Sequence, residues 1–92
     1  MPKLVFTCQV EDGAEWEKKF QTHGDLFKSA TITGSIAYGI NDKNEVGSVF
    51  EVTDLEKYME VLSSQAAAEV MAHDGVKKET VKVFVVNREY RP

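Results

Sequence analysis

Apolar and polar side chains alternate at the start of the chain, which is the period-2 pattern of a strand with two unlike faces. The apolar positions of this first strand are Leu4, Phe6, Cys8 and Val10. The alternation returns over 31–40, where one face is apolar and the other is small and polar. Two more runs rich in β-branched and aromatic residues lie at 46–52 and about 80–87. The pattern therefore predicts four strands.

After the first strand the apolar spacing changes to that of a helix. One stripe recurs at intervals of four, three and four residues: Trp16, Phe20, His23 and Phe27. Positions at these intervals share one face of a helix. Asp12 is a suitable N-cap, and Glu15 three residues later completes a capping box. We expect one helix that runs from Asp12 to about Ala30.

A second helix is predicted between the third and fourth strands. Thr53-Asp54-Leu55-Glu56 matches the S/T-x-x-E capping box, in which the Thr hydroxyl and the Glu carboxylate bond backbone N–H groups at a helix start. The helix is expected to break near Ser63-Ser64 and to resume over 65–73. Gly75 follows as the residue that ends it, since glycine adopts the left-handed conformation common after a helix.

The elements follow the order β-α-β-β-α-β, and the turn residues 41–45 close a hairpin between the two middle strands. With right-handed crossovers this order gives a four-stranded antiparallel sheet in the order 4-1-3-2, with helices on one face only. The fourth strand then lies at an edge, although its residues 81–86 are apolar on both faces. An exposed strand of this kind is usually covered. We expect one α+β domain of ferredoxin-like fold, spanning 1–92, that is covered by a second copy.

This layout resembles the dimeric α+β barrel superfamily, in which two ferredoxin-like subunits press their open sheet faces together. The order of elements covers the whole chain, and three segments carry the more specific likeness: 16–23, 68–76 and 81–87. They are most similar to small uncharacterised members and, more distantly, to antibiotic-biosynthesis-type monooxygenases. The resemblance implies the fold and a homodimer more than a function, because the superfamily includes monooxygenases, isomerase-like proteins, stress-responsive proteins and members with no known activity.

Haem degradation, another activity of the superfamily, is not implied. Haem-degrading members use an Asn on the first strand, a Trp on a later strand and a His on the second helix, which His73 matches only loosely. Here the first strand offers Thr7, Cys8 and Gln9, and the single Trp16 lies on the first helix. Fingerprints for flavin, nicotinamide or nucleotide binding are also missing from the sequence. We therefore predict no cofactor.

Charge and cysteine content limit the kinds of partner and the compartment that we expect. Eleven Lys and Arg against fifteen Asp and Glu give a net charge of -4, which opposes binding to nucleic acid and to anionic membranes. The single Cys8 cannot form an internal disulfide, and its place among the apolar positions of the first strand predicts a buried, structural thiol. The N-terminus enters a strand without a signal segment. We expect the cytoplasm.

His23 is the leading candidate for chemistry, because it lies in the apolar stripe of the first helix and should face the sheet, near Tyr38. There it could act as a general base or, as a cation, stabilise an enolate or phenolate. Tyr38 would orient the ligand. The alternative is a core histidine whose ring is satisfied by a backbone carbonyl or by Tyr38. Both interpretations stay open.

An aromatic pocket for a flat ligand is the second candidate. Its predicted lining is Trp16, Phe20, Phe27 and Tyr58. Such side chains combine an apolar body with a few directed hydrogen bonds. The alternative is that they only fill the core, as aromatics at helical spacing usually do. His73-Asp74 offers two metal-ligand types, but two ligands are too few, so no metal site is predicted.

These patterns favour a homodimer that binds a small, partly apolar molecule between sheet and helices. His23 would be the acid or base of an oxygenation or isomerisation. A dimeric module that binds a ligand or serves assembly without catalysis is the competing hypothesis. The two differ in whether a cavity of ligand size lies beside His23.

Overall fold

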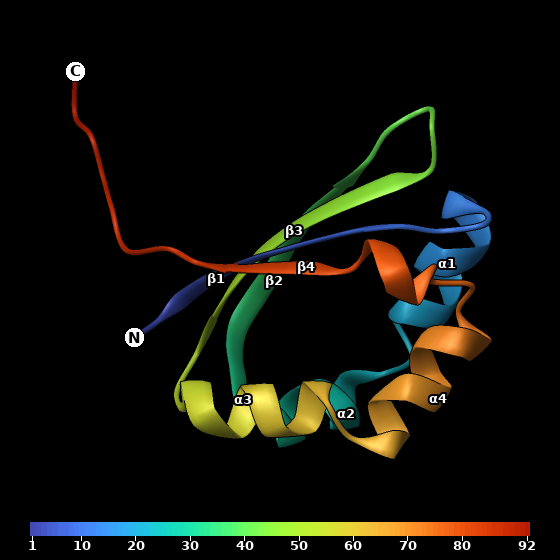
Figure 1. The fold of residues 1–92 in the computed structure, drawn as a ribbon, viewed down its shortest axis with the longest axis horizontal. Coiled ribbons are helices and arrows are strands. Elements are labelled where there is room, and N and C mark those ends of the chain that lie inside the picture. Colours follow the sequence, from blue (N-terminus) through green and yellow to red (C-terminus); the bar gives the residue numbers. More distant parts are fainter.

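Four strands form a single antiparallel sheet in the order β2-β3-β1-β4 in the computed structural model, which describes all of residues 1–92 (Figure 1). The strands are β1 (Lys3–Gln9), β2 (Ile32–Ile40), β3 (Glu45–Val52) and β4 (Lys82–Val85). The helices are α1 (Gly13–Phe20), α2 (Gly24–Ser29), α3 (Leu55–Leu62), α4 (Gln65–His73) and the short 3-10 helix η1 (Lys78–Thr80). The four α-helices lie on one side of the sheet, and η1 directly precedes β4 at its edge. The predicted ferredoxin-like fold and strand order are confirmed.

The first helix is two helices, and the prediction of one continuous helix was wrong. Helix α1 ends at Phe20, and α2 begins at Gly24 with His23 as its N-cap residue. The backbone N–H groups of Thr22 and His23 bond carbonyls three residues earlier, and the Thr22 hydroxyl also bonds the Lys19 carbonyl at 2.6 Å. These bonds satisfy the last carbonyls of α1 and end it, while the weak helix former Gly24 does not favour continuation.

The other helix boundaries agree more closely with the sequence. Asp12 caps α1 as predicted, accepting from the backbone of Ala14 and Glu15. The break at Ser63-Ser64 is confirmed, and the Ser64 hydroxyl caps α4. The cap of α3 is Asp54 rather than the predicted Thr53, since the Asp54 carboxylate accepts from the Lys57 N–H at 3.0 Å.

Helix α4 ends in a Schellman motif. Gly75 has a φ of 77°, the Gly75 N–H bonds the Ala72 carbonyl, and the Val76 N–H bonds the Met71 carbonyl. The predicted role of Gly75 is therefore confirmed. The chain then forms η1 over 78–80, so β4 begins at Lys82 rather than at residue 80.

The core lies between the helices and the covered face of the sheet. Its two buried clusters are Leu4, Ala30, Phe50, Val52 and Tyr58, and Cys8, Val10, Trp16 and Val46. Cys8 is buried as predicted, and burial raises the pKa of its thiol to about 11, so the thiolate is scarce at neutral pH. None of the helices has both the length and the apolar character that crossing a bilayer requires.

Candidate ligand site

A cavity of about 120 Å³ lies between the sheet and the helices. Side chains from β1, β2 and β3 form its floor, and side chains from all four α-helices form its walls. Of its 19 lining residues 16 are hydrophobic, and the remaining three are His23, Ser48 and Asp74. This combination of apolar walls and a few polar groups is typical of small-molecule sites. Its volume is on the scale of the roughly 150 Å³ apolar cavity known to accept benzene.

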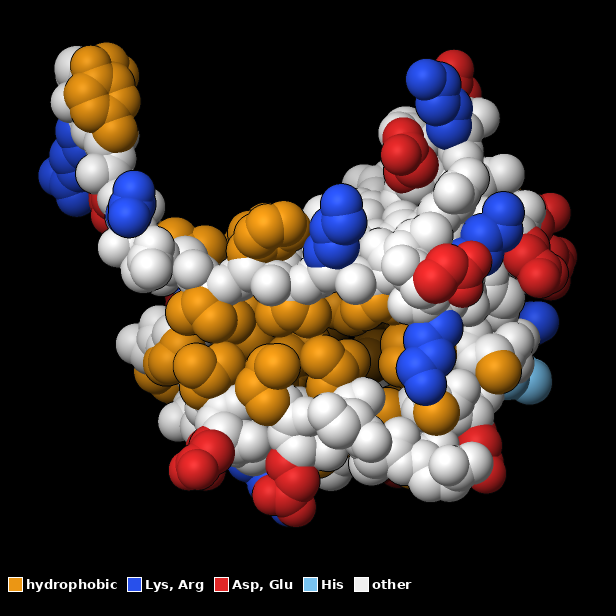
Figure 2. Space-filling view, in the orientation of Figure 1, with side chains coloured by type: hydrophobic (Ala, Val, Ile, Leu, Met, Phe, Trp, Pro, Cys, Tyr) orange, Lys and Arg blue, Asp and Glu red, His pale blue; other side chains and the backbone are white.

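An apolar surface lies beside the β4 edge of the sheet (Figure 2). Figure 2 shows hydrophobic side chains gathered in the gap between β4 and α3, with the surface hollowed toward η1 and α4. Met59 on α3 and Val85 on β4 are among the exposed hydrophobic residues of these two elements. β4 is an edge strand, so no further strand closes this side.

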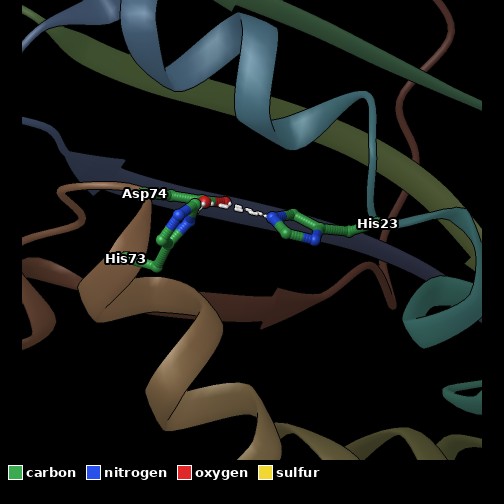
Figure 3. A group of neighbouring side chains, drawn as sticks. All are labelled: His23, His73 and Asp74. Atoms are coloured by element: carbon green, nitrogen blue, oxygen red, sulfur yellow. Dashed lines mark hydrogen bonds and ion pairs between the residues drawn. The ribbon is translucent and has the colours of Figure 1, made fainter.

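One end of the cavity is formed by a histidine held by a carboxylate (Figure 3). The His23 Nε2 lies 2.8 Å from Oδ2 and 3.0 Å from Oδ1 of Asp74. The Asp74 carboxylate also lies 3.1 Å from Nδ1 of His73. The side chains of His23 and Asp74 are only 15% and 5% exposed, whereas that of His73 is 67% exposed. The buried pair thus faces the cavity, and His73 faces solvent.

Local structure fixes each partner of this pair. Asp74 is the C-cap residue of α4, and the Schellman motif that follows it is tied to the end of β1 by the bond from the Glu11 N–H to the Gly75 carbonyl at 3.0 Å. His23 stands in the short link between α1 and α2, where its ring makes no cap bond to α2. The break between the helices therefore leaves the ring free to reach Asp74.

The hydrogen bonds define which nitrogen of His23 carries the proton. An ionised carboxylate only accepts, so Nε2 of a neutral imidazole donates to Asp74, and Nδ1 keeps its lone pair. No protein group bonds Nδ1. A carboxylate that fixes the tautomer and orientation of a histidine base is the arrangement of many acid–base sites. In this tautomer Nδ1 is the nitrogen of His23 that has a free lone pair.

Aromatic rings line the wall next to His23. Trp16 and Phe20 stack with ring centroids 4.6 Å apart, and Phe20 and Phe27 lie 5.1 Å apart. The His23 and Phe27 rings are arranged edge to face, with their centroids 6.3 Å apart. Tyr58 lies in the wall as well, and burial raises its pKa to about 12. All four residues named from the sequence as ligand contacts thus line the cavity, and they also pack in the core.

Tyr38 lies outside the cavity lining. Its ring packs against Trp16 and Phe20, with ring centroids 5.8 and 5.2 Å away. Its hydroxyl donates to the Glu17 carboxylate at 2.5 Å and accepts from the Gln21 amide at 3.3 Å. The hydrogen bond to Glu17 raises the pKa of Tyr38. Tyr38 therefore packs against two rings of the aromatic wall without lining the cavity itself.

Asp74 was missed as a site residue, because the sequence pairs it with His73 at a helix end and separates it from His23 by 51 positions. Topology contained part of the signal. β4 begins beside the end of β1, where Thr7 pairs with Lys82. Helix α1 follows β1 and helix α4 precedes β4 in the chain. The C-terminus of α4 is therefore expected near the start of α1, but this order does not by itself bring Asp74 to the link that follows α1.

The chain matches no protein-family model and no curated protein. Its fold is similar to several solved structures. A protein from Bordetella bronchiseptica assigned to the antibiotic biosynthesis monooxygenases shares 15% identity and a TM-score of 0.72, with 97% of each chain covered. SnoaB, a cofactor-independent oxygenase from Streptomyces nogalater, shares 14% identity and a TM-score of 0.67, with 98% of this chain and 94% of that one covered.

The chain shares its fold with these proteins. A dimeric ferredoxin-like protein from an uncultured marine organism is also similar, with 16% identity, a TM-score of 0.57, and 99% of this chain and 92% of that one covered. The resemblance predicted from the sequence is thus confirmed at the level of fold. Identities this low establish the architecture, whereas activity has to be argued from the site.

Proposed function

We propose that this protein binds a small, partly apolar molecule in the cavity and that His23 acts on it as an acid or base. The observation that carries the proposal is the His23–Asp74 pair at the end of an otherwise apolar cavity. The walls would bind the ligand by burying its apolar surface, and His23 would recognise its acidic O–H or C–H group. A base in such a site contributes roughly 10² to 10⁴-fold to the rate of proton transfer.

Proton abstraction at Nδ1 of His23 would leave an enolate or phenolate in the cavity, and the resulting imidazolium would be stabilised by Asp74. Return of the proton to a different carbon gives an isomer. Where the carbon that lost the proton is a methylene, reaction of the resulting carbanion with dioxygen converts that carbon to a ketone. One oxygen atom becomes the carbonyl oxygen, the other leaves as water with the two methylene hydrogens, and the substrate supplies all the electrons that reduce dioxygen. The likeness to SnoaB, described as a cofactor-independent oxygenase, favours the oxygenation.

Exchange of the α-hydrogens of 2-indanone with heavy water tests the proton transfer without knowledge of the natural substrate. 2-Indanone is flat and apolar with one ketone, which matches the cavity. We expect the wild-type protein to accelerate the exchange, measured by proton NMR, and His23→Asn to lose roughly 10² to 10⁴-fold of the acceleration. Glu69→Ala is the control, because Glu69 is an exposed residue of α4 that neither lines the cavity nor hydrogen-bonds His23 or Asp74. Equal acceleration by wild type and His23→Asn would contradict the proposal.

A binding role without catalysis is the second candidate, favoured by the small number of polar groups in the cavity. The same experiment separates the two. If 2-indanone binds in the cavity but its exchange rate equals that of buffer alone, the site is a ligand carrier rather than an active site.

We also propose that two copies associate through the open face of the sheet. One row of apolar side chains crosses all four strands in register: Ala37, Val49, Val5 and Phe84. Val49 and Phe84 are 40% and 53% exposed in the single chain. The next row is formed by Gly39, Gly47, Thr7 and Lys82, which are small or polar. An apolar centre with a polar margin is the composition of a protein interface.

A further inference from the structure

The three side chains at the end of the cavity also have the composition of a metal site. We propose that His23, His73 and Asp74 together bind one divalent transition-metal ion of the zinc type. Two imidazole nitrogens and a carboxylate oxygen are ligands that zinc and similar ions accept. Only two ligands are apparent in the sequence at His73-Asp74, and the structure brings a third from 51 positions away.

The geometry needs little change to hold an ion. Zinc lies about 2.0 to 2.2 Å from nitrogen and oxygen ligands, so two ligands of one ion are at most about 4.4 Å apart. The carboxylate of Asp74 lies 2.8 Å from Nε2 of His23 and 3.1 Å from Nδ1 of His73. All three ligand atoms lie within 4.8 Å of one another. A small rotation of the exposed His73 ring brings its nitrogen to coordination distance.

Access and charge are also suitable. His73 is 67% exposed, so an ion can reach the site from solvent while His23 and Asp74 stay fixed below it. With three protein ligands the ion keeps at least one position for water or a ligand atom. One positive charge lies close to the site, because the Lys19 Nζ bonds the His73 carbonyl at 3.1 Å. The chain as a whole has a net charge of -4.

Metal binding changes what His23 can do. An ion at Nε2 takes the lone pair of that nitrogen, and the imidazole proton moves to Nδ1. Nδ1 then donates a hydrogen bond instead of accepting a proton. The metal-bound site would therefore bind a ligand through the Nδ1 N–H donor of His23 and the open position on the metal. A bound ion would also suppress the base activity proposed above.

Calorimetric titration of the full chain with zinc chloride tests the site, with cobalt(II) absorption as a second readout. We expect one ion per chain in the wild type. His73→Ala should weaken binding by more than the roughly 10- to 100-fold lost when only a supporting group around a metal ligand is removed. Glu69→Ala is the matched control, because Glu69 is an exposed carboxylate on the same helix and should leave binding unchanged.

Two results would overturn the inference: no zinc binding by the wild type at micromolar concentration, or equal binding by wild type and His73→Ala. Neither result bears on the acid–base proposal, because zinc binding is measured without 2-indanone and exchange is measured without zinc. Conversely, failure of 2-indanone exchange in metal-free protein leaves the zinc titration unaffected.

Discussion

Val49→Asp is expected to convert the proposed dimer to a monomer at micromolar concentration. Val49 lies on β3 in the middle of the apolar row that crosses the open face of the sheet. In a two-fold interface each substitution occurs twice, so two carboxylates would be placed in an apolar centre. Unfavourable charge placement in an interface costs several kcal/mol, and each 1.4 kcal/mol is a factor of ten. The dissociation constant should therefore rise by at least about 100-fold.

Sedimentation equilibrium measures the change directly. Met59→Asp is the matched control, since Met59 is 42% exposed against 40% for Val49 but lies on α3, away from the open face. It should remain a dimer. Thermal melting of both variants shows whether either substitution unfolds the chain. A wild-type protein that sediments as a single chain at micromolar concentration would contradict the dimer.

Ala67→Phe should abolish binding of 2-indanone. Ala67 is a buried residue of α4 that lines the cavity, and a phenyl ring in its place would occupy most of a space of about 120 Å³. Overpacking of this kind typically costs about 1 to 3 kcal/mol of stability, so the variant should melt at a lower temperature but still fold. Binding is measured from chemical-shift changes in NMR spectra during titration.

The control for this variant is Ala66→Phe. Ala66 precedes Ala67 on the same helix but is exposed, so the same ring adds no volume to the cavity. We expect Ala66→Phe to bind 2-indanone with the wild-type affinity. If Ala67→Phe binds equally well, the ligand lies elsewhere and the cavity is not the site.

The sheet could be predicted because its information is local. Alternation over Leu4 to Val10, the turn at 41–45 and the ending of α4 at Gly75 each specify backbone geometry within a few residues. The standard crossover rule then determines the strand order. The break between α1 and α2 was missed because the apolar stripe from Trp16 to Phe27 reads as continuous. The break depends on the backbone hydrogen bonds of Thr22 and His23, which end α1, and Gly24 does not favour continuation of the helix.

Only part of the site could be predicted from the sequence. His23 stood out because a titratable ring occupied an apolar stripe, and the aromatic wall followed from the same spacing. Its partner was not visible, since Asp74 reads locally as the end of a helix. Contacts between residues 51 positions apart depend on the packing of two elements, which no spacing rule encodes.

The nitrogen-15 chemical shifts of the His23 ring test the proposed role of this residue most directly. At a pH where the ring is neutral, we predict that Nε2 carries the proton and Nδ1 does not, because Asp74 accepts from Nε2. Addition of 2-indanone should shift the Nδ1 resonance in the wild type but not in Ala67→Phe. A proton on Nδ1 in the free protein, or an Nδ1 resonance that the probe does not change, would contradict a base at the end of the cavity.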